Sequence, residues 1–392
     1  MRRMALLLLV LVAAVPATGA PASDPQANDV VVTGSRLTDT ERALAACIAR
    51  KCPPDQEIAA TLAHAENQFI AGDYAGARAT LRRGISRNGR HAAAFPVPVS
   101  DLHRASATIA VHLGRGESYR FESYEAVSAL RAGLPKDDPR VLDTQLQVGT
   151  MLARLEDFRA AVEVYADVAA RAHALDLADV EGLARLRLAT AYSAYALVNR
   201  DYLAKAGRFA DALATNTDPR FARYARAGRI LKTRLAIRDG NQQAVDELIA
   251  ESRLDPTDVP ALIYAPVPDL DGFFLTISGR ISSRTIFNFA DQWVDIAFYV
   301  LPDGRVDDPG VIRRSPKLSS EAWLQPLLAS VAKRRYAALK LDPRDPGLLR
   351  VERYTLTSRY VEGPGTRLDV RDGIPRLEML DLSVSSKQRA AN

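Results

Sequence analysis

Few side chains of this sequence combine the residue types and the spacing that catalysis requires. Its histidines form no metal-binding pattern such as H-E-x-x-H, and the chain contains no nucleophile elbow, phosphate-binding loop or dinucleotide-binding motif. Acids such as Asp291, Asp295 and Asp303 are expected on strand faces or turns, where solvation explains them. We therefore predict no catalytic residue, no metal site and no cofactor. The histidines are expected at the surface or between helices: His64, His91, His103, His112 and His173.

The two cysteines, Cys47 and Cys52, have the clearest chemistry in the chain. Pro53 and Pro54 follow directly and end a helix, so Cys52 is free to turn back toward Cys47. We expect a local disulfide in an oxidising compartment. Two buried thiols are the alternative, whereas a zinc site would need a third and a fourth ligand that this pair lacks.

The first 22 residues have the pattern of a secretory signal peptide. Two arginines precede an unbroken apolar run from Ala5 to Val15, and small residues follow up to Ala22. The run is well short of the ~20 residues that a membrane-spanning helix needs. We therefore expect export to the periplasm with residues 1–22 removed; the alternative is an N-terminal anchor in the inner membrane.

Composition and charge exclude two classes of protein. The chain is 47% hydrophobic and 25% charged, which is incompatible with intrinsic disorder. Its net charge of +5 is a mild excess for 392 residues and does not indicate a nucleic-acid partner.

Residues 56–256 are predicted to form helical hairpins, because one pattern of residues recurs after 84 positions. The first set is Ala65, Tyr74, Ala77, Leu81 and Gly84, and the second is Gly149, Phe158, Ala161, Tyr165 and Val168. In each set a small residue lets two helices approach, and an aromatic residue follows the turn. This pattern resembles the tetratricopeptide repeat, whose hairpins stack into a curved solenoid with a concave binding face.

One helix of this region, from Phe221 to Arg238, is strongly basic. An apolar stripe that includes Tyr224 is surrounded by basic residues, and no acid interrupts them. Four residues are candidate contacts for a carboxylate or phosphate of a partner: Tyr224, Arg223, Arg226 and Arg229. The alternative is a solvated face that pairs with acids on neighbouring helices.

Residues 257–392 are predicted to form a second domain, because aromatic and β-branched residues become frequent there. Apolar residues alternate strictly in the segment 293–300, and Pro302-Asp303-Gly304-Arg305 is typical of a turn before a second strand over 306–312. A helix over 323–336 and a strand over 349–357 complete the unit. The predicted fold class is thus mainly α with a C-terminal α+β domain, in which a small antiparallel sheet packs on a helix after the helical-hairpin solenoid.

The order of these C-terminal elements resembles the C-terminal domain of TonB energy transducers. The similarity covers about residues 286–357 and includes the D-G-R-V turn and the basic-aromatic run Lys333-Arg334-Arg335-Tyr336. This resemblance implies that an edge strand pairs with an extended peptide from a partner. We place that edge at residues 349–357, with Val351 and Arg353 as candidate contacts.

A second resemblance lies in residues 23–55, an extended segment followed by the short cysteine-bridged helix. The sequence from Asp29 to Leu37 is similar to the TonB box of outer-membrane receptors, and its six candidate contacts are Val30, Val31, Val32, Thr33, Gly34 and Ser35. An ordinary strand or a mobile tail is the alternative. In this interpretation the segment docks on its own C-terminal domain, on a second copy, or on a TonB complex.

The expected function is therefore that of a periplasmic adaptor or regulator that binds other envelope proteins and is linked to TonB-dependent transport. The chain has no long Pro-rich spacer between anchor and domain, so energy transduction by this chain alone is not expected. An envelope enzyme or cell-wall-associated factor without a recognisable motif is the alternative.

Overall fold

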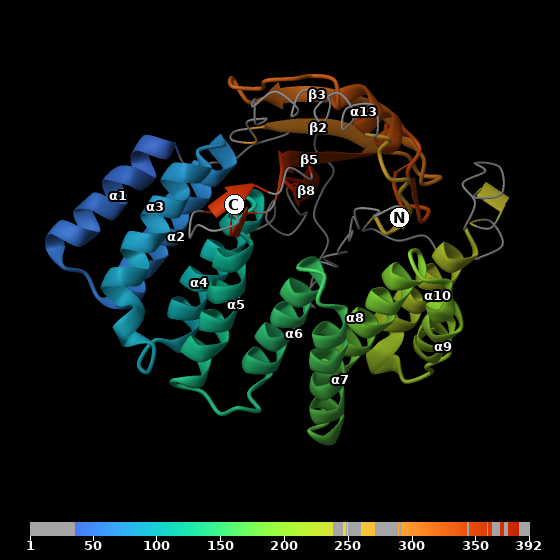
Figure 1. Cartoon of the computed structure of the whole chain (residues 1–392), viewed down its shortest axis with the longest axis horizontal. Coiled ribbons are helices and arrows are strands. Elements are labelled where there is room, and N and C mark those ends of the chain that lie inside the picture. Colours follow the sequence, from blue (N-terminus) through green and yellow to red (C-terminus); the bar gives the residue numbers. More distant parts are fainter. Residues whose placement is uncertain are drawn as a thin grey trace.

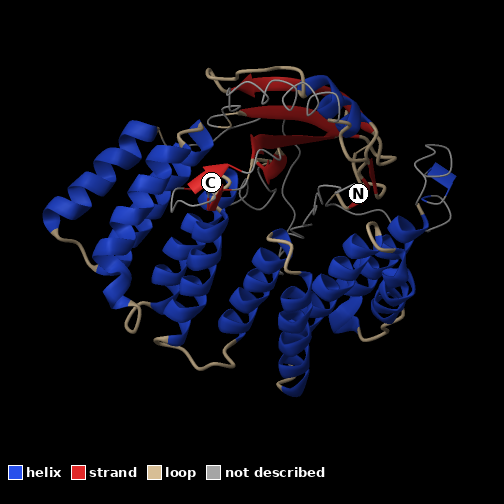
Figure 2. Cartoon of the chain, in the orientation of Figure 1, coloured by secondary structure: helices blue, strands red, loops and turns tan. Residues whose placement is uncertain are grey.

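The computed structural model describes residues 36–237, 246–247, 249, 260–270, 289, 292–342, 345–358, 360–362, 369–371 and 375–383. The predicted signal peptide and the segment Val30–Ser35 lie outside the described residues. Figure 1 shows the helices in a curved row, with a sheet across the concave side of the row. Figure 2 separates the two parts by secondary structure, and the prediction of a mainly helical chain with a small C-terminal antiparallel sheet is confirmed.

Ten α-helices form the row within residues 36–237, which we call the helical array. They are α1 (Leu37–Arg50), α2 (Pro54–Ala71), α3 (Tyr74–Asn88), α4 (Pro96–His112), α5 (Gly116–Arg131), α6 (Pro139–Arg154), α7 (Phe158–Ala174), α8 (Ala178–Ala196), α9 (Leu203–Ala214) and α10 (Ala222–Ala236). Each helix packs against the next one in the chain. Proline at the first position of α2, α4 and α6 suits a helix start, since its missing N–H would have no partner there.

Three turns of the array share one backbone geometry at intervals of 42 residues. Gly72, Gly114 and Glu156 have φ values of +89°, +67° and +69°, and each follows the end of a helix. The next residue in each turn donates its N–H to a carbonyl five residues back, which closes the helix end. The 84-residue offset in the sequence therefore spans two structural repeats, each longer than the 34 residues of a typical tetratricopeptide repeat.

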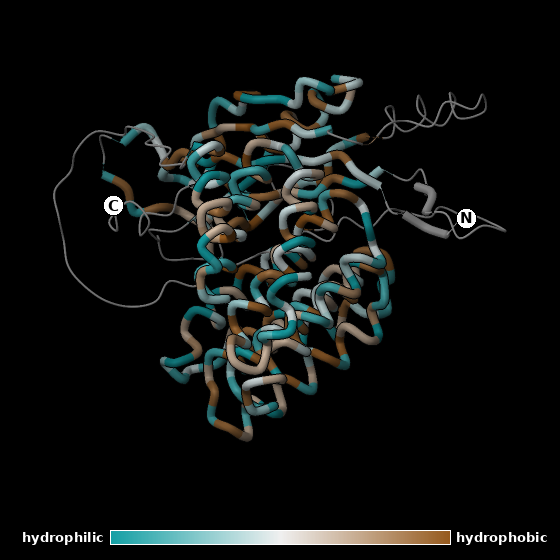
Figure 3. The backbone as a smooth tube through the Cα atoms, turned by 90° about the vertical axis from the view of Figure 1, so that its left-hand side faces the viewer, coloured by the Kyte–Doolittle hydropathy of each residue, from teal (hydrophilic) through white to brown (hydrophobic). Residues whose placement is uncertain are grey.

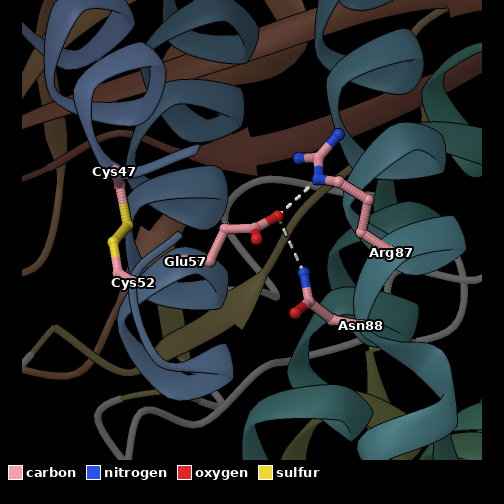
Figure 4. The surroundings of a disulfide bond; sticks show 5 residues. All are labelled: Cys47, Cys52, Glu57, Arg87 and Asn88. Atoms are coloured by element: carbon pink, nitrogen blue, oxygen red, sulfur yellow. Dashed lines mark hydrogen bonds and ion pairs between the residues drawn. A yellow bond between two sulfur atoms is a disulfide. The ribbon is translucent and has the colours of Figure 1, made fainter. Parts of the chain in front are cut away.

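The hairpin of α2 and α3 is also fixed at the end that lies away from the turn at Gly72. Figure 4 shows the Cys47–Cys52 disulfide between α1 and the start of α2, as expected from the sequence, and the carboxylate of Glu57 beside the end of α3. Glu57 accepts hydrogen bonds from Arg87 Nε at 2.5 Å and from Asn88 Nδ2 at 3.0 Å. A covalent link and a partly buried polar cluster thus hold the first three helices together.

A four-stranded antiparallel sheet forms the main part of the C-terminal region. Its strands are β2 (Trp293–Val300), β3 (Val306–Arg314), β5 (Leu348–Thr357) and β8 (Arg376–Asp381), in the spatial order β3-β2-β5-β8. Helix α13 (Leu324–Ala332) packs on the sheet around a core that includes Phe298, Trp323 and Leu327. The predicted series of strand, hairpin, helix and strand is therefore present, but the helix ends at Ala332, whereas the sequence predicted it to continue to residue 336.

Short strands accompany the sheet. Strand β1 (Leu262–Tyr264) pairs with β4 (Arg335–Tyr336), and β6 (Tyr360–Glu362) pairs with β7 (Asp369–Arg371). Figure 3, turned by 90°, shows the sheet above the array with hydrophobic segments interspersed in both parts.

The prediction that residues 349–357 form an edge strand is wrong. Strand β5 lies between β2 and β8 and pairs antiparallel with both of them. The six-residue strand β8 covers that edge, and so short a run gives no clear strand signal in the sequence.

Candidate functional site

The junction between the helical array and the sheet contains a group of buried charged and polar side chains. At its centre Arg353 of β5 is fully buried. Its guanidinium donates to both oxygens of the Asp295 carboxylate, at 2.7 and 3.0 Å, and to the carbonyls of Phe69 and Ile70, each at 2.8 Å. Those carbonyls belong to the last turn of α2, where a cation is favoured by the helix dipole. Arg353, proposed from the sequence as a partner contact, thus joins two parts of its own chain.

An indole ring covers this ion pair on the array side. Trp293 of β2 lies with its ring 4.1 Å from the guanidinium carbon of Arg353 and 5.3 Å from that of Arg313. The ring lies directly against Gly72, where a Cβ atom would come within 2.4 Å of it. Arg313 also donates to the Asp295 carboxylate at 2.7 Å. The turn between α2 and α3 is therefore shaped to receive the aromatic face of β2.

A second polar group lies beside the first. The hydroxyl of Thr355 is 2.9 Å from the Tyr74 hydroxyl and 3.1 Å from Nδ1 of His112. Burial raises the pKa of Tyr74 above its usual value. Burial also lowers the pKa of His112 to about 3, and the positive charges of Arg154 and Arg353 add to this effect. His112 is therefore neutral in the folded protein at ordinary pH.

The turn between α6 and α7 contacts the far edge of the sheet. Arg154 of α6 pairs with Glu378 of β8 at 2.7 Å, and Arg376 of β8 pairs with Glu156 in the turn at 2.5 Å. Arg376 also donates to the carbonyl of Arg154. Together with the contacts of Gly72 and of Gly114, which lies against Ser358, the three turns of equivalent geometry each face the sheet.

The basic-aromatic run near residue 335 faces inward. Arg334 is buried, pairs with Glu352 at 2.7 Å, and donates to the hydroxyl of Tyr354, which itself donates to Glu352. Burial and the negative charge of Glu352 raise the pKa of Tyr354 well above its usual value. Arg335 pairs with Asp246 at 2.7 Å. These arginines anchor the sheet domain instead of forming an exposed cationic surface.

The candidate residues of α10 have partners on neighbouring helices. Arg223 pairs with Asp179 at 2.6 Å, and the Tyr224 hydroxyl donates to the carbonyl of the same aspartate. Arg226 also has an interaction partner, and Arg229 is exposed. The alternative interpretation, in which basic residues of this helix pair with acids on neighbouring helices, is therefore confirmed for Arg223.

Another arginine of α10 reaches the sheet domain. Arg234 is partly buried and donates to the carbonyls of Leu262 and Ile263 at 2.6 and 2.8 Å. Burial lowers its pKa to about 10. The end of the array and strand β1 are thereby connected.

Two strands form the edges of the sheet. Among the described residues, β3 pairs with β2 only and β8 pairs with β5 only, so both outer edges are open, and β3 is the longer of the two strands. Pro309 lacks an N–H, Asp308 has a φ of +47°, and the pairing with β2 shifts register twice, all of which interrupt the middle of the strand. The usable edge is therefore its last part, Val311–Arg314, where Ile312 is 60% exposed.

The remaining histidines also have polar partners. His103 lies 2.7 Å from Glu122, His173 lies 3.2 Å from Glu181, and His64 lies 3.1 Å from the hydroxyl of Thr40. His91 accepts from the neighbouring Arg90. Within the described ranges, no group of three or more potential ligands could hold a metal ion. No helix there has the length and apolar character needed to cross a membrane.

The expectation that solvation explains Asp295 is wrong, because this carboxylate is 1% exposed and neutralised by two arginines. Strand alternation could have indicated it, since Asp295 falls one residue from the apolar positions and would face a different surface. That second surface is covered by the array, which the sequence of the strand alone does not reveal. A comparison with known protein families finds no match for this chain, and neither does a comparison with curated proteins.

Proposed function

We propose that the protein is an exported adaptor that binds other envelope proteins by accepting an extended peptide at the outer edge of β3. The observation that carries this proposal is the open edge at Val311–Arg314, because a strand edge offers backbone donors and acceptors to an added strand. Strand β5, the edge expected from the sequence, lies between two strands and offers no free edge to a ligand.

The sheet domain has the rigidity that such a binding mode requires. Arg313, at the open edge, donates to the carbonyl of Ile70 in α2 at 2.9 Å as well as to Asp295. An added strand would therefore meet an edge that is already ordered, which lowers the entropy cost of association. The order of strands and helix supports a TonB-like C-terminal domain as the finer classification, and the consecutive hairpins support a tetratricopeptide-like array, although the 42-residue interval exceeds the usual repeat.

The proposed ligand is an extended segment with a sequence similar to Val30–Ser35. The first four residues of this segment are β-branched, and Asp29 precedes them. Arg313 and Arg314 at this end of β3 are paired with Asp295 and Glu321, so recognition would rest on backbone hydrogen bonds and on the β-branched side chains of the ligand, not on charge. Such a segment is supplied by a second copy of this chain or by an outer-membrane receptor with a similar sequence.

The test uses a labelled peptide with the sequence of residues 29–37 and the mature protein from which these residues have been deleted. Fluorescence anisotropy should show saturable binding, and a scrambled peptide should bind less. Ile312→Lys, which places a flexible charge on the open edge, should weaken binding by about tenfold, or ~1.4 kcal/mol.

The matched control is Leu197→Lys, the same chemical change at a 75% exposed position after α8. It should leave the peptide affinity unchanged. Equal binding of the scrambled peptide, or equal effects of the two lysines, would reject strand addition at β3. Crosslinking in intact envelopes with both variants then identifies the natural partner.

A further inference from the structure

A small pocket lies beside the second of the three turns, the one between α4 and α5, at the junction of the array and the sheet. It has a volume of about 30 Å³. Its walls come from the α4–α5 turn, the end of α6, the end of β5 and the start of β8. The lining residues that bear polar side chains are Arg115, Tyr119, Arg154, Thr357, Ser358, Arg376 and Glu378.

The helix that begins at this pocket lacks the cap of its equivalents. Asp73 accepts a hydrogen bond from the N–H of Gly76 at the start of α3, and Asp157 does the same for Ala160 at the start of α7. The equivalent position before α5 is Arg115, whose side chain makes no capping bond. The first-turn N–H groups of α5 therefore lack the carboxylate that satisfies them in both neighbouring repeats.

Two hydroxyls in the pocket wall add an independent observation. Thr357 and Ser358 are 2% and 0% exposed, and neither side-chain oxygen has a hydrogen-bond partner among the described residues. A buried hydroxyl without a hydrogen-bond partner is unfavourable, because nothing replaces the hydrogen bonds that it makes with water in the unfolded chain. Both residues line the pocket, so a ligand there could accept from them.

The charges around the pocket favour an anion. Three arginines line it, while Glu378 is its single acidic residue and is already paired with Arg154. Arg376 is paired with Glu156 outside the wall. An arginine at the start of a helix adds to the positive end of the helix dipole instead of compensating it.

We propose that this pocket binds the carboxylate of a ligand, which takes the place of the aspartate that caps the equivalent helices. The first-turn N–H groups of α5 and the hydroxyls of Thr357 and Ser358 would donate to it. A water molecule needs roughly 10–15 Å³, so a pocket of about 30 Å³ admits a group of two or three non-hydrogen atoms, which is the size of a carboxylate. The ligand would bridge α5 and the end of β5, and so couple occupancy to the docking of the sheet on the array.

The experiment titrates the mature protein with sodium acetate against sodium chloride at equal ionic strength. The readouts are the melting temperature and the amide resonance of Ser118, the third residue of α5. Acetate should raise the melting temperature more than chloride and shift the Ser118 resonance. A short peptide with a free C-terminus, compared with its amidated form, distinguishes a peptide carboxylate from a small organic acid as the natural source.

Arg115→Asp supplies the missing cap from within the chain and should remove the acetate response, while it raises the melting temperature without acetate. Arg83→Asp makes the same change of charge at an exposed position of α3 and should keep the response. Ser358→Ala, which leaves the helix start intact, should weaken acetate binding by about tenfold, as the loss of one hydrogen bond to a charged group predicts. An acetate effect equal to that of chloride, or one retained in Arg115→Asp, would overturn the proposal.

Discussion

Arg353 and Asp295 form an ion pair in which neither residue has more than 1% of its surface exposed. The pair joins β5 to β2, and the remaining donors of the arginine bind the carbonyls at the end of α2. One side chain thus connects two strands and a helix, and its contacts with α2 span more than 280 residues of sequence. This connection holds the sheet across the concave side of the array (Figure 1).

Replacement of Arg353 by alanine should destabilise the protein by about 3–5 kcal/mol, because it leaves a buried carboxylate and the two helix-end carbonyls without this partner. Urea unfolding followed by circular dichroism measures the change. The double variant Arg353→Met with Asp295→Leu removes both charges and should lose less stability than Arg353→Ala. A larger loss in the double variant would show that packing, not the unpaired charge, dominates.

Replacing the glycine of the α4–α5 turn by alanine should destabilise the protein, whereas the same substitution at a glycine within α9 should stabilise it. Gly114 has a φ of +67°, and a Cβ atom there would lie 1.6 Å from the carbonyl oxygen of Ser358. Gly114→Ala should therefore disturb the contact between the α4–α5 turn and the sheet and lower the melting temperature.

The matched substitution is Gly207→Ala inside α9, where a Cβ atom would meet nothing within 4 Å. It should stabilise the protein by about 0.5–1 kcal/mol, since alanine restricts the unfolded chain and suits a helix interior. Differential scanning calorimetry of both variants measures the two opposite shifts. Equal shifts would contradict the importance of the turn contact.

The local elements were predictable because their signals are local. Alternation marks β2, proline and capping residues mark helix starts, and the 84-residue repetition marks hairpins such as α2–α3. The cysteine spacing with the following prolines likewise indicated the disulfide.

The junction was not predictable in the same way, since its contacts connect distant segments. Nothing near Asp295 in the sequence indicates that Arg353 neutralises it or that α2 covers it. Whether the second edge of β5 is exposed depends on β8, which follows in the chain only after the short strands β6 and β7. The candidate site could therefore be located only from the arrangement of helices and strands in space, whereas the fold class could be predicted from the periodicity of apolar residues in the sequence.

Loss of the Cys47–Cys52 disulfide should loosen α1 more than the rest of the array. This helix packs mainly on α2 and has only Leu44 and Cys47 buried. Chain-entropy reasoning for so short a loop gives roughly 2 kcal/mol of stabilisation. Hydrogen exchange with and without a reductant should show faster exchange in residues 37–50, with α4 unchanged as the internal control. Uniformly faster exchange would indicate that α1 is essential to the whole array.

Acidification should destabilise the junction through His112, whose folded-state pKa of about 3 lies below the ordinary value of 6.5. Between these two values the unfolded chain binds one more proton than the folded chain. The free energy of unfolding should therefore fall by up to about 1.4 kcal/mol for each unit of pH below 6.5, and this contribution is fully present above that pH. Its cause is burial, reinforced by the nearby Arg154 and Arg353.

Urea midpoints measured from about pH 8 to pH 4 test this slope. His112→Gln keeps a polar group near Thr355 but cannot titrate. The slope of its free energy of unfolding against pH should therefore be smaller than that of the wild type by the contribution of one proton. His91→Gln, at a partly exposed histidine after α3, is the matched control and should keep the wild-type slope. If His112→Gln leaves the slope unchanged, the acid sensitivity resides in other groups and the histidine is not buried as the structure describes.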